Sequence, residues 1–160
     1  MKFRIMLVED HPMFRKALRL NLEMCPDFEV VAEADTGGAA LAALATCRPD
    51  VVCLDVNLPD QNGVVLTGQL LAQQPGIKII GLSAQSNFLV MKKMIDAGAQ
   101  GYVEKVHAGR DIHTAIVAVC SDQFYLSPDV DANDAAELVA VALSKRHPIC
   151  TGNQSDSPNL

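Results

Sequence analysis

Residues 3–12 read Phe-Arg-Ile-Met-Leu-Val-Glu-Asp-His-Pro, and this stretch sets a pattern that the rest of the chain repeats. Its apolar run is short, is typical of a buried strand, and ends in Glu9 and Asp10. Pro12 follows, and proline suits the first turn of a helix because its missing N–H has no intrahelical partner there. The stretch therefore predicts a strand, two carboxylates at its end, and a helix.

The same alternation of short apolar runs and longer stretches of helical period continues to about Cys120. It predicts an α/β fold, in which helices cover both faces of a parallel sheet. Several runs are nearly continuous in Val, Ile and Leu, as strands covered on both faces usually are. The five predicted strands are Phe3–Val8, Phe28–Ala32, Val51–Leu54, Ile77–Leu82 and Gly101–Val103.

Apolar spacing predicts the inward faces of the first and last helical stretches. Phe14, Ala17 and Leu18 form the stripe of the first. The last has apolar residues at the i, i+3, i+4, i+7 spacing of an amphipathic helix, and it completes a fivefold strand–helix pattern. The residues of that stripe are Ile112, Ala115, Ile116 and Val119.

The chain changes character after Pro128. We expect one domain over residues 1–128 and a linker and tail over 129–160, beginning with the polar stretch around Asp129 and Asp131. Apolar residues at helical spacing predict a short helix at 134–145, and Asp134 with Glu137 resembles a capping box at its start. Residues 151–160 are rich in Ser, Asn, Gly and Asp, and we expect them to be disordered.

Composition restricts the class of protein. A chain of 160 residues with 49% hydrophobic and 20% charged residues fits one ordinary globular domain. No apolar run approaches the roughly 20 residues of a membrane-spanning helix, and the N-terminus does not resemble a signal peptide, so we expect a cytoplasmic protein without membrane contact. The formal charge of −6 argues against a broad nucleic-acid-binding surface within these residues.

The cysteines and histidines indicate no metal site of their own. The five cysteines are scattered and lack Cys-x-x-Cys spacing, so we interpret them as buried free thiols. The four histidines likewise lack metal-ligand spacing, which favours surface or capping roles.

Carboxylates end two of the predicted strands. Glu9 and Asp10 follow the first strand and Asp55 follows the third. Because the carboxyl ends of parallel strands meet at one edge, we expect these groups to converge, and their repulsion requires a cation. Oxygen ligands with no nearby His or Cys favour Mg²⁺. Ser83 ends the fourth strand and Lys105 follows the fifth, which adds a hydroxyl and an ammonium group at the same edge.

Each of these residues has a simpler interpretation when it is taken alone. Glu9 and Asp10 would cap the following helix, Ser83 would be a turn residue, and Lys105 would be solvated. Their joint placement at four strand ends is what favours a site.

These segments together resemble the receiver domains of two-component response regulators, over roughly the first 128 positions. The resemblance is closest to the NarL/FixJ type, and it implies a flavodoxin-like (βα)5 fold with strand order 2-1-3-4-5. The segments that carry it are Ile-Met-Leu-Val-Glu-Asp-His-Pro-Met-Phe-Arg from position 5, Leu-Asp-Val-Asn-Leu-Pro-Asp-Gln-Asn-Gly from position 54, Leu-Ser-Ala at 82–84, Gly-Tyr-Val-Glu-Lys at 101–105 and Tyr-Leu-Ser-Pro-Asp-Val from position 125.

The resemblance assigns roles residue by residue. It makes the chain a phosphoacceptor that promotes its own phosphorylation and dephosphorylation, and not an enzyme that turns over a substrate. Tyr102 and Ser83 would be the switch pair, although a half-exposed aromatic packing beside a helix is an alternative for Tyr102. The implied roles are Asp55 as phosphoacceptor, Ser83 and Lys105 as its catalytic partners, Glu9, Asp10, Asp55 and the backbone carbonyl of Asn57 as Mg²⁺ ligands, and Asn57 and Gln85 as residues that tune the lifetime of the phosphoryl group.

The resemblance also implies partners. A sensor histidine kinase would donate the phosphoryl group, and phosphorylation would promote a homodimer through a surface of the fourth and fifth helical segments. About thirty residues follow position 128, too few for a DNA-binding domain of roughly 60 residues, so we expect DNA contact only through a domain outside this chain. A stand-alone receiver or adaptor that acts by protein–protein contact is the alternative.

Two rival hypotheses come from other classes. An aspartate-nucleophile phosphatase would need a cap inserted after Asp55 and a second acid where Asn57 stands, and the sequence has neither. A receiver-like scaffold that is never phosphorylated would not need the acidic pair together with Asp55, Ser83 and Lys105.

Overall fold

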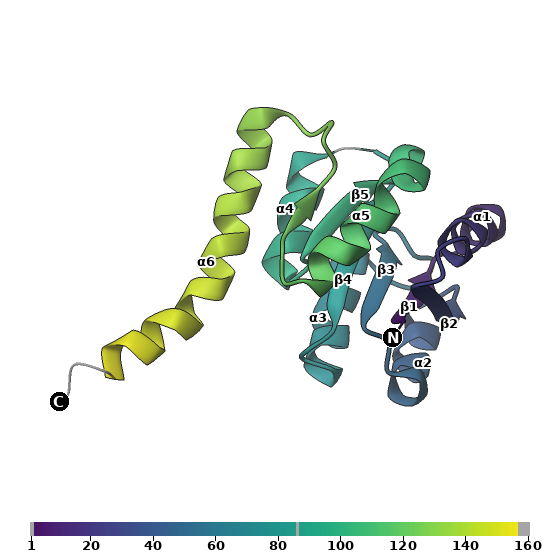
Figure 1. The fold of residues 1–160 in the computed structure, drawn as a ribbon, viewed down its shortest axis with the longest axis horizontal. Helices are drawn as coiled ribbons and strands as arrows, with labels where there is room; N and C mark the ends of the chain where they lie inside the picture. Colours follow the sequence, from purple (N-terminus) through teal and green to yellow (C-terminus); the bar gives the residue numbers. More distant parts are fainter. Residues whose placement is uncertain (1, 86, 157–160) are drawn as a thin grey trace.

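The computed structural model describes residues 2–85 and 87–156, with side chains described as far as Lys145. A parallel sheet forms the centre of the molecule, with strands in the order β2-β1-β3-β4-β5-β6 (Figure 1). The predicted order of the first five strands is confirmed. The strands are β1 (Phe3–Val8), β2 (Phe28–Ala34), β3 (Val51–Asp55), β4 (Lys78–Ser83), β5 (Gly101–Glu104) and β6 (Tyr125–Leu126).

The sixth strand corrects the prediction of a five-stranded sheet. β6 has two residues and pairs in parallel with Gly101 and Tyr102 of β5. The backbone N–H of Ser127 then donates to the carbonyl of Tyr102 at 3.3 Å. Two residues are too few to show strand periodicity, so tertiary pairing alone defines this strand.

Helices cover both faces of the sheet, as predicted (Figure 1). Residues of α1 and α5 share one hydrophobic cluster with one face, and residues of α2, α3, α4 and α6 share another cluster with the opposite face. The helices are α1 (Pro12–Glu23), α2 (Gly37–Cys47), α3 (Gly63–Gln73), α4 (Phe88–Ala97), α5 (Ala108–Cys120) and α6 (Ala132–Asp156), and a single 3-10 turn, η1 (Lys105–His107), joins β5 to α5.

Side-chain alternation along β1 divides the core. Ile5 and Leu7 face α1 and α5, whereas Met6 and Val8 face α2, α3 and α4, and all four are fully buried. The strand is therefore apolar at every position until it reaches the sheet edge, where Glu9 begins.

The predicted inward stripes are largely confirmed. All four residues of the α5 stripe are fully buried. In α1 Leu18 is buried and Phe14 partly so, but Ala17 is exposed, which corrects that part of the prediction. Pro12 occupies the first turn of α1, as expected.

The last helix is longer than predicted. α6 begins at Ala132, and the carboxylate of Asp131, not Asp134, accepts hydrogen bonds from the backbone N–H groups of Asn133 and Asp134. The helix continues to Asp156, so residues 151–156, for which we expected disorder, are its last turns. Residues 157–160 of the predicted tail lie outside the described residues.

None of the helices that the structure describes combines the length and the apolar character needed to cross a bilayer.

Four cysteines are free thiols, as predicted, namely Cys25, Cys47, Cys53 and Cys120. Of these four only Cys53 is buried, and the other three are partly exposed. The side chain of Cys150 lies outside the described residues.

Candidate functional site

Carboxylates and an ammonium group meet at the carboxyl edge of the sheet. Glu9 and Asp10 follow β1, Asp55 ends the adjacent β3, and Lys105 follows β5. The predicted convergence is confirmed, because parallel strands bring these ends to one edge. Ligand atoms from four residues lie within 4.8 Å of one another, namely those of Glu9, Asp10, His11 and Asp55.

Lys105 joins the two buried carboxylates. Its Nζ lies 2.6 Å from Oε1 and 2.9 Å from Oε2 of Glu9, and 3.0 Å from Oδ2 of Asp55. The ring of Phe14 in α1 covers the same ammonium group, with its centroid 5.1 Å from Nζ. The side chains of Glu9 and Asp55 are only 1% and 3% exposed, so their attraction to Lys105 is weakly screened by water.

The environment separates the protonation of the two carboxyl groups. Burial, reinforced by Asp55, raises the pKa of Glu9 to about 7. Burial also tends to raise the pKa of Asp55, but hydrogen bonds with Glu9, the Asn57 N–H and Lys105 outweigh it and lower that pKa. Burial tends to lower the pKa of Lys105, and its two carboxylate partners outweigh this and raise it. The lowered pKa favours the ionised form of Asp55.

The turn after β3 fixes the carboxylate of Asp55. The backbone N–H of Asn57 donates to its Oδ1 at 3.0 Å. Gly63, the first residue of α3, folds back so that its N–H donates to the carbonyl of Val56 at 2.7 Å. A Cβ on Gly63 would lie 2.7 Å from Val56 Cα and 2.8 Å from the carbonyl oxygen of Asp55, so only glycine fits this approach.

The same loop is tied to α2. The carboxylate of Asp60 accepts hydrogen bonds from the N–H groups of Gly37 and Gly38, at 2.9 and 3.1 Å. These bonds hold the pKa of Asp60 below its ordinary value. A carboxylate at a helix N-terminus also meets the positive end of the helix dipole.

The acidic residues fit a divalent cation. Oδ1 of Asp10 is buried and receives no hydrogen bond from the described residues, although Nδ1 of His11 lies 3.3 Å away. A buried carboxylate oxygen that receives no hydrogen bond, together with two further carboxylates, forms the kind of donor set that Mg²⁺ prefers. The carbonyl role predicted for Asn57 stays a prediction.

His11 is the residue of the cluster that the sequence did not indicate. Its Nδ1 lies 3.1 Å from Oε1 of Glu9, and its side chain is 70% exposed. His11 stands at the cap position of α1 but makes no side-chain capping bond, so its ring is free to turn toward the acidic pair. Its position directly after two carboxylates was the only clue in the sequence.

Ser83 lies at the same edge but forms its hydrogen bonds with the following loop. Its Oγ donates to the carbonyl of Gln85 at 2.7 Å and accepts from the N–H of Gln85 at 3.3 Å. The structure thus brings Glu9, Asp10, Asp55 and Lys105 together and leaves Ser83 bonded to its own loop. Nothing in these contacts tests the tuning role predicted for the Gln85 side chain.

Tyr102 is fully buried in β5, which contradicts the half-exposed alternative. Its hydroxyl has no hydrogen-bond partner of acceptable geometry among the described residues. Burial raises the pKa of the phenol, and the nearby hydroxyl of Ser83 opposes that change. The two residues predicted as the switch pair are therefore neighbours.

Fold and site together define a class: a parallel α/β sheet with an acidic pocket, a strand-end aspartate and a lysine partner. The chain belongs to the response regulator receiver domain family, whose pattern matches residues 5–117.

Named proteins agree with this assignment. The chain is 36% identical over 137 residues to the DNA-binding transcriptional activator DevR/DosR of Mycobacterium tuberculosis, covering 86% of this chain and 61% of that protein. It is 32% identical over 132 residues to the transcriptional regulatory protein DegU of Brevibacillus brevis, covering 82% of this chain and 56% of that protein. The chain thus spans little more than half the length of these relatives.

A solved structure gives the same answer. The crystal structure of a LuxR-family two-component response regulator from Aurantimonas sp. SI85-9A1 superposes with a TM-score of 0.80 at 32% identity. The match covers 87% of this chain and 99% of that one. The NarL/FixJ-type resemblance seen in the sequence is therefore confirmed.

Proposed function

We propose that this chain is a phosphorylation switch of a two-component system, in which Asp55 accepts a phosphoryl group from a phosphohistidine of a sensor kinase. The observation that supports this best is the contact of Lys105 with both Asp55 and Glu9 inside a pocket of carboxylates. This arrangement keeps Asp55 ionised and places a positive charge beside the oxygen that would attack.

The proposed reaction is an in-line transfer. A carboxylate oxygen of Asp55 attacks the phosphorus, an oxygen–phosphorus bond forms, and the phosphorus–nitrogen bond of the phosphohistidine breaks, leaving the imidazole with its electron pair. Lys105 pairs with the negative charge on the transferred group. Glu9, Asp10 and Asp55 would hold Mg²⁺, which when bound supplies further positive charge against the phosphoryl oxygens.

Phosphorylation would then change the contacts of Ser83. To hydrogen-bond the new phosphoryl oxygens, Ser83 has to leave the carbonyl of Gln85, so the loop between β4 and α4 has to move. Asn57 and Gln85 would flank the path of the water that later hydrolyses the acyl phosphate. The chain would thus promote its own phosphorylation and dephosphorylation without turning over a separate substrate.

The output that we propose is control of transcription in the cytoplasm. Relatives named as DNA-binding activators support this, and DNA contact would need a domain beyond the residues of this chain. Phosphorylation would act through a homodimer. A stand-alone receiver or adaptor that works by protein–protein contact is the alternative.

The first prediction concerns Asp55 itself. Asp55→Asn is expected to abolish labelling by a small phosphodonor with Mg²⁺ present, because the amide cannot act as the nucleophile. Intact-protein mass spectrometry would measure the added phosphoryl group. Asp27→Asn, at an exposed carboxylate before β2, is the matched control and should label like the unchanged protein.

Other outcomes separate the rival hypotheses. Equal labelling of Asp55→Asn would refute the site. Absence of labelling in the unchanged protein would favour an unphosphorylated scaffold, and steady release of phosphate from many small substrates would favour a phosphatase.

A further inference from the structure

The helix α6 is seated on the face of the receiver that carries the switch aromatic. It packs against α4, and its Leu138 is fully buried while Ala142 is 9% exposed. Both belong to the same continuous hydrophobic cluster as Met94 of α4 and Tyr102 of β5. The helix thus contributes two side chains, Leu138 and Ala142, to the hydrophobic cluster on this side of the sheet.

Direct contacts connect this cluster to the turn that holds Asp55. Thr67 of α3 donates to the carbonyl of Gly63 at 2.8 Å, and its hydroxyl lies 3.8 Å from Sδ of Met94. Gly81 of β4 lies beside both Met94 and Tyr102. A Cβ at this position would lie 2.9 Å from Met94 Cε and 3.2 Å from the Tyr102 ring. A displacement of the turn that holds Asp55, or of β5, is therefore transmitted to α4 through packed side chains.

The segment leading into α6 is tied to the same strand. β6 pairs with Tyr102, and Asp129 bonds to residues that follow Lys105: its Oδ2 lies 2.6 Å from Nη2 of Arg110 and 3.2 Å from Nε2 of His107. His107 ends the 3-10 turn that Lys105 begins. The segment before α6 is therefore bonded to the turn and helix that follow Lys105.

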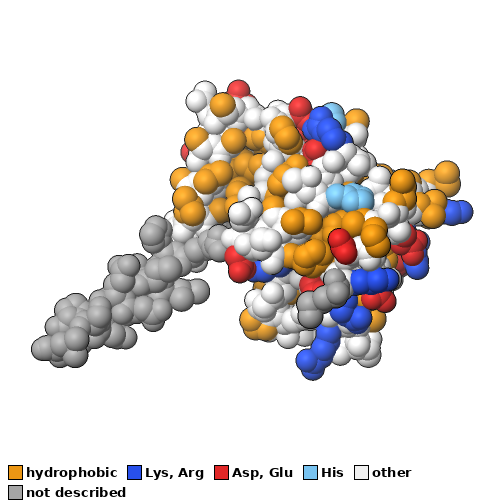
Figure 2. All heavy atoms as spheres, viewed as in Figure 1, with side chains coloured by type: hydrophobic (Ala, Val, Ile, Leu, Met, Phe, Trp, Pro, Cys, Tyr) orange, Lys and Arg blue, Asp and Glu red, His pale blue; other side chains and the backbone are white. Residues whose placement is uncertain are grey.

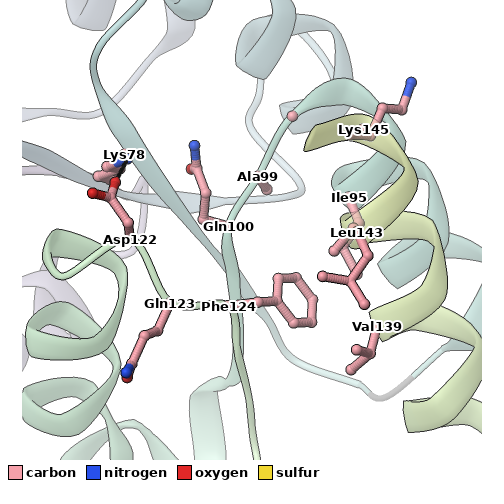
Figure 3. Close-up of a pocket in the computed structure, with 12 residues that line it drawn as sticks. Lys78, Ile95, Ala99, Gln100, Asp122, Gln123, Phe124, Val139, Leu143 and Lys145 are labelled. Atoms are coloured by element: carbon pink, nitrogen blue, oxygen red, sulfur yellow. Dashed lines mark hydrogen bonds and ion pairs between the residues drawn. The ribbon is translucent and has the colours of Figure 1, made fainter. Parts of the chain in front are cut away.

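The seam between α6 and the body is not fully packed. A cavity of about 220 Å³ remains there, and Figure 3 shows four side chains pointing into it: Phe124 from the segment before β6, Ile95 from α4, and Val139 and Leu143 from α6. Hydrophobic side chains also gather along the described part of α6 in Figure 2. Because an unfilled seam loses part of the contact energy, the docked helix is held less firmly than a core element.

We propose that α6 is an output arm whose docking on α4 weakens when Asp55 is phosphorylated. The inference rests on the proposed function and adds the element that reports it. Once Ser83 leaves Gln85, the loop before α4 moves. The packing of Leu138 of α6 in the cluster that includes Met94 of α4 is then weakened. Linkage is reciprocal, so a variant that undocks α6 should bind a phosphoryl mimic more tightly.

The test uses the whole chain with Mg²⁺, in the presence and absence of beryllofluoride, followed by amide hydrogen exchange. We expect residues 133–145 to exchange at least tenfold faster with the mimic, while amides near Asp55 and Ser83 become protected. Protection of amides near Asp55 and Ser83 with unchanged exchange in α6 would overturn the role proposed for α6 and leave the proposed function intact. No protection anywhere would overturn the proposed function and the arm with it.

A matched pair of variants supplies the second measurement. Leu138→Ala removes a fully buried contact, whereas Leu20→Ala removes the same atoms from a position in α1 that is 57% exposed. Leu138→Ala should lower the beryllofluoride concentration at half-saturation several-fold, and Leu20→Ala should change it less than twofold. Equal values for Leu138→Ala and the unchanged chain would contradict the coupling.

Discussion

Gly63 shows how one residue controls the position of the nucleophile. It is the last residue of the Leu-Asp-Val-Asn-Leu-Pro-Asp-Gln-Asn-Gly segment, and it packs directly against the backbone of Val56 and Asp55. Its hydrogen bond to Val56 closes the turn that presents the carboxylate. The absence of a side chain at this position is therefore a requirement of the site, and not only of α3.

Gly63→Ala is expected to destabilise the protein by about 1–3 kcal/mol, because the new methyl group would overlap backbone atoms that cannot move away cheaply. Urea denaturation would measure the change in the free energy of unfolding. Gly68→Ala is the control: it lies in the same helix with no atom within 4 Å of an added Cβ, and should stabilise slightly, by about 0.5–1 kcal/mol. A neutral Gly63→Ala variant would contradict the close approach.

At this scale the sequence predicted which residues meet, but not how each one is oriented. Glu9, Asp10, Asp55 and Lys105 could be predicted because strand ends of a parallel sheet converge. The bond of Ser83 to Gln85 and the turn of His11 toward the acidic pair depend on side-chain rotamers and loop geometry. Residue spacing does not encode these.

At the scale of elements, Asp111 joins α5 to the segment that follows it. Its side chain is 5% exposed, accepts from Arg110 at 2.7 and 3.0 Å, and accepts from Ser127 at 3.2 Å. Asp111 also stands in the first turn of α5, where a negative charge is favourable. Arg110, more than burial, sets the pKa of Asp111 below its ordinary value of 3.8.

Asp111→Asn is expected to cost about 1 kcal/mol at pH 7, since a charged buried acceptor is lost while its exposed Arg110 partner is screened by water. A pKa below the ordinary value means that the carboxylate stabilises the fold above pH 3.8, and that this contribution disappears as the pH falls through the pKa of the folded state. The gap in the free energy of unfolding between the Asp111→Asn variant and the unchanged protein should therefore narrow as the pH falls.

Urea denaturation between pH 7 and pH 3 would measure that gap. Asp27→Asn, at an exposed carboxylate before β2, is the control and should change the free energy of unfolding at pH 7 by less than about 0.5 kcal/mol. A gap that widened in acid would show that Asp111 is not stabilised as the ionised form.

Long elements were predictable and short ones were not. The five main strands and the α5 stripe repeat often enough for periodicity to indicate them. β6 has only two residues. The start of α6 depends on which aspartate caps it, and the sequence offers both Asp131 and Asp134 as capping residues. The final turns of α6, residues 151–156, consist largely of Gly, Asn, Ser and Asp, which disfavour helix interiors, so composition favoured disorder there.

At the scale of the molecule, Cys53 reports on the whole fold. It lies in β3 between β1 and β4, is completely buried, and has a thiol whose pKa burial raises to about 12. Thiol reagents attack the thiolate, so this residue should react only when the sheet opens.

We expect Cys53 to label at least about a hundredfold more slowly than Cys25 and Cys47, which are partly exposed. Peptide mapping after timed labelling at pH 8 would measure each rate separately. In urea the rate at Cys53 should rise in step with global unfolding. Labelling of Cys53 as fast as Cys25 would mean that the central strand opens locally.

The contact between Lys105 and Glu9 joins positions that are 96 residues apart. During translation the first strand and its acid leave the ribosome long before the lysine is made, so the nascent chain carries carboxylates that lack their counter-charge. A β-sheet begun at that stage would have to bury them unpaired. The ion pair of Lys105 with Glu9 therefore forms only after the fifth strand has emerged, which ties this contact to nearly full synthesis of the domain.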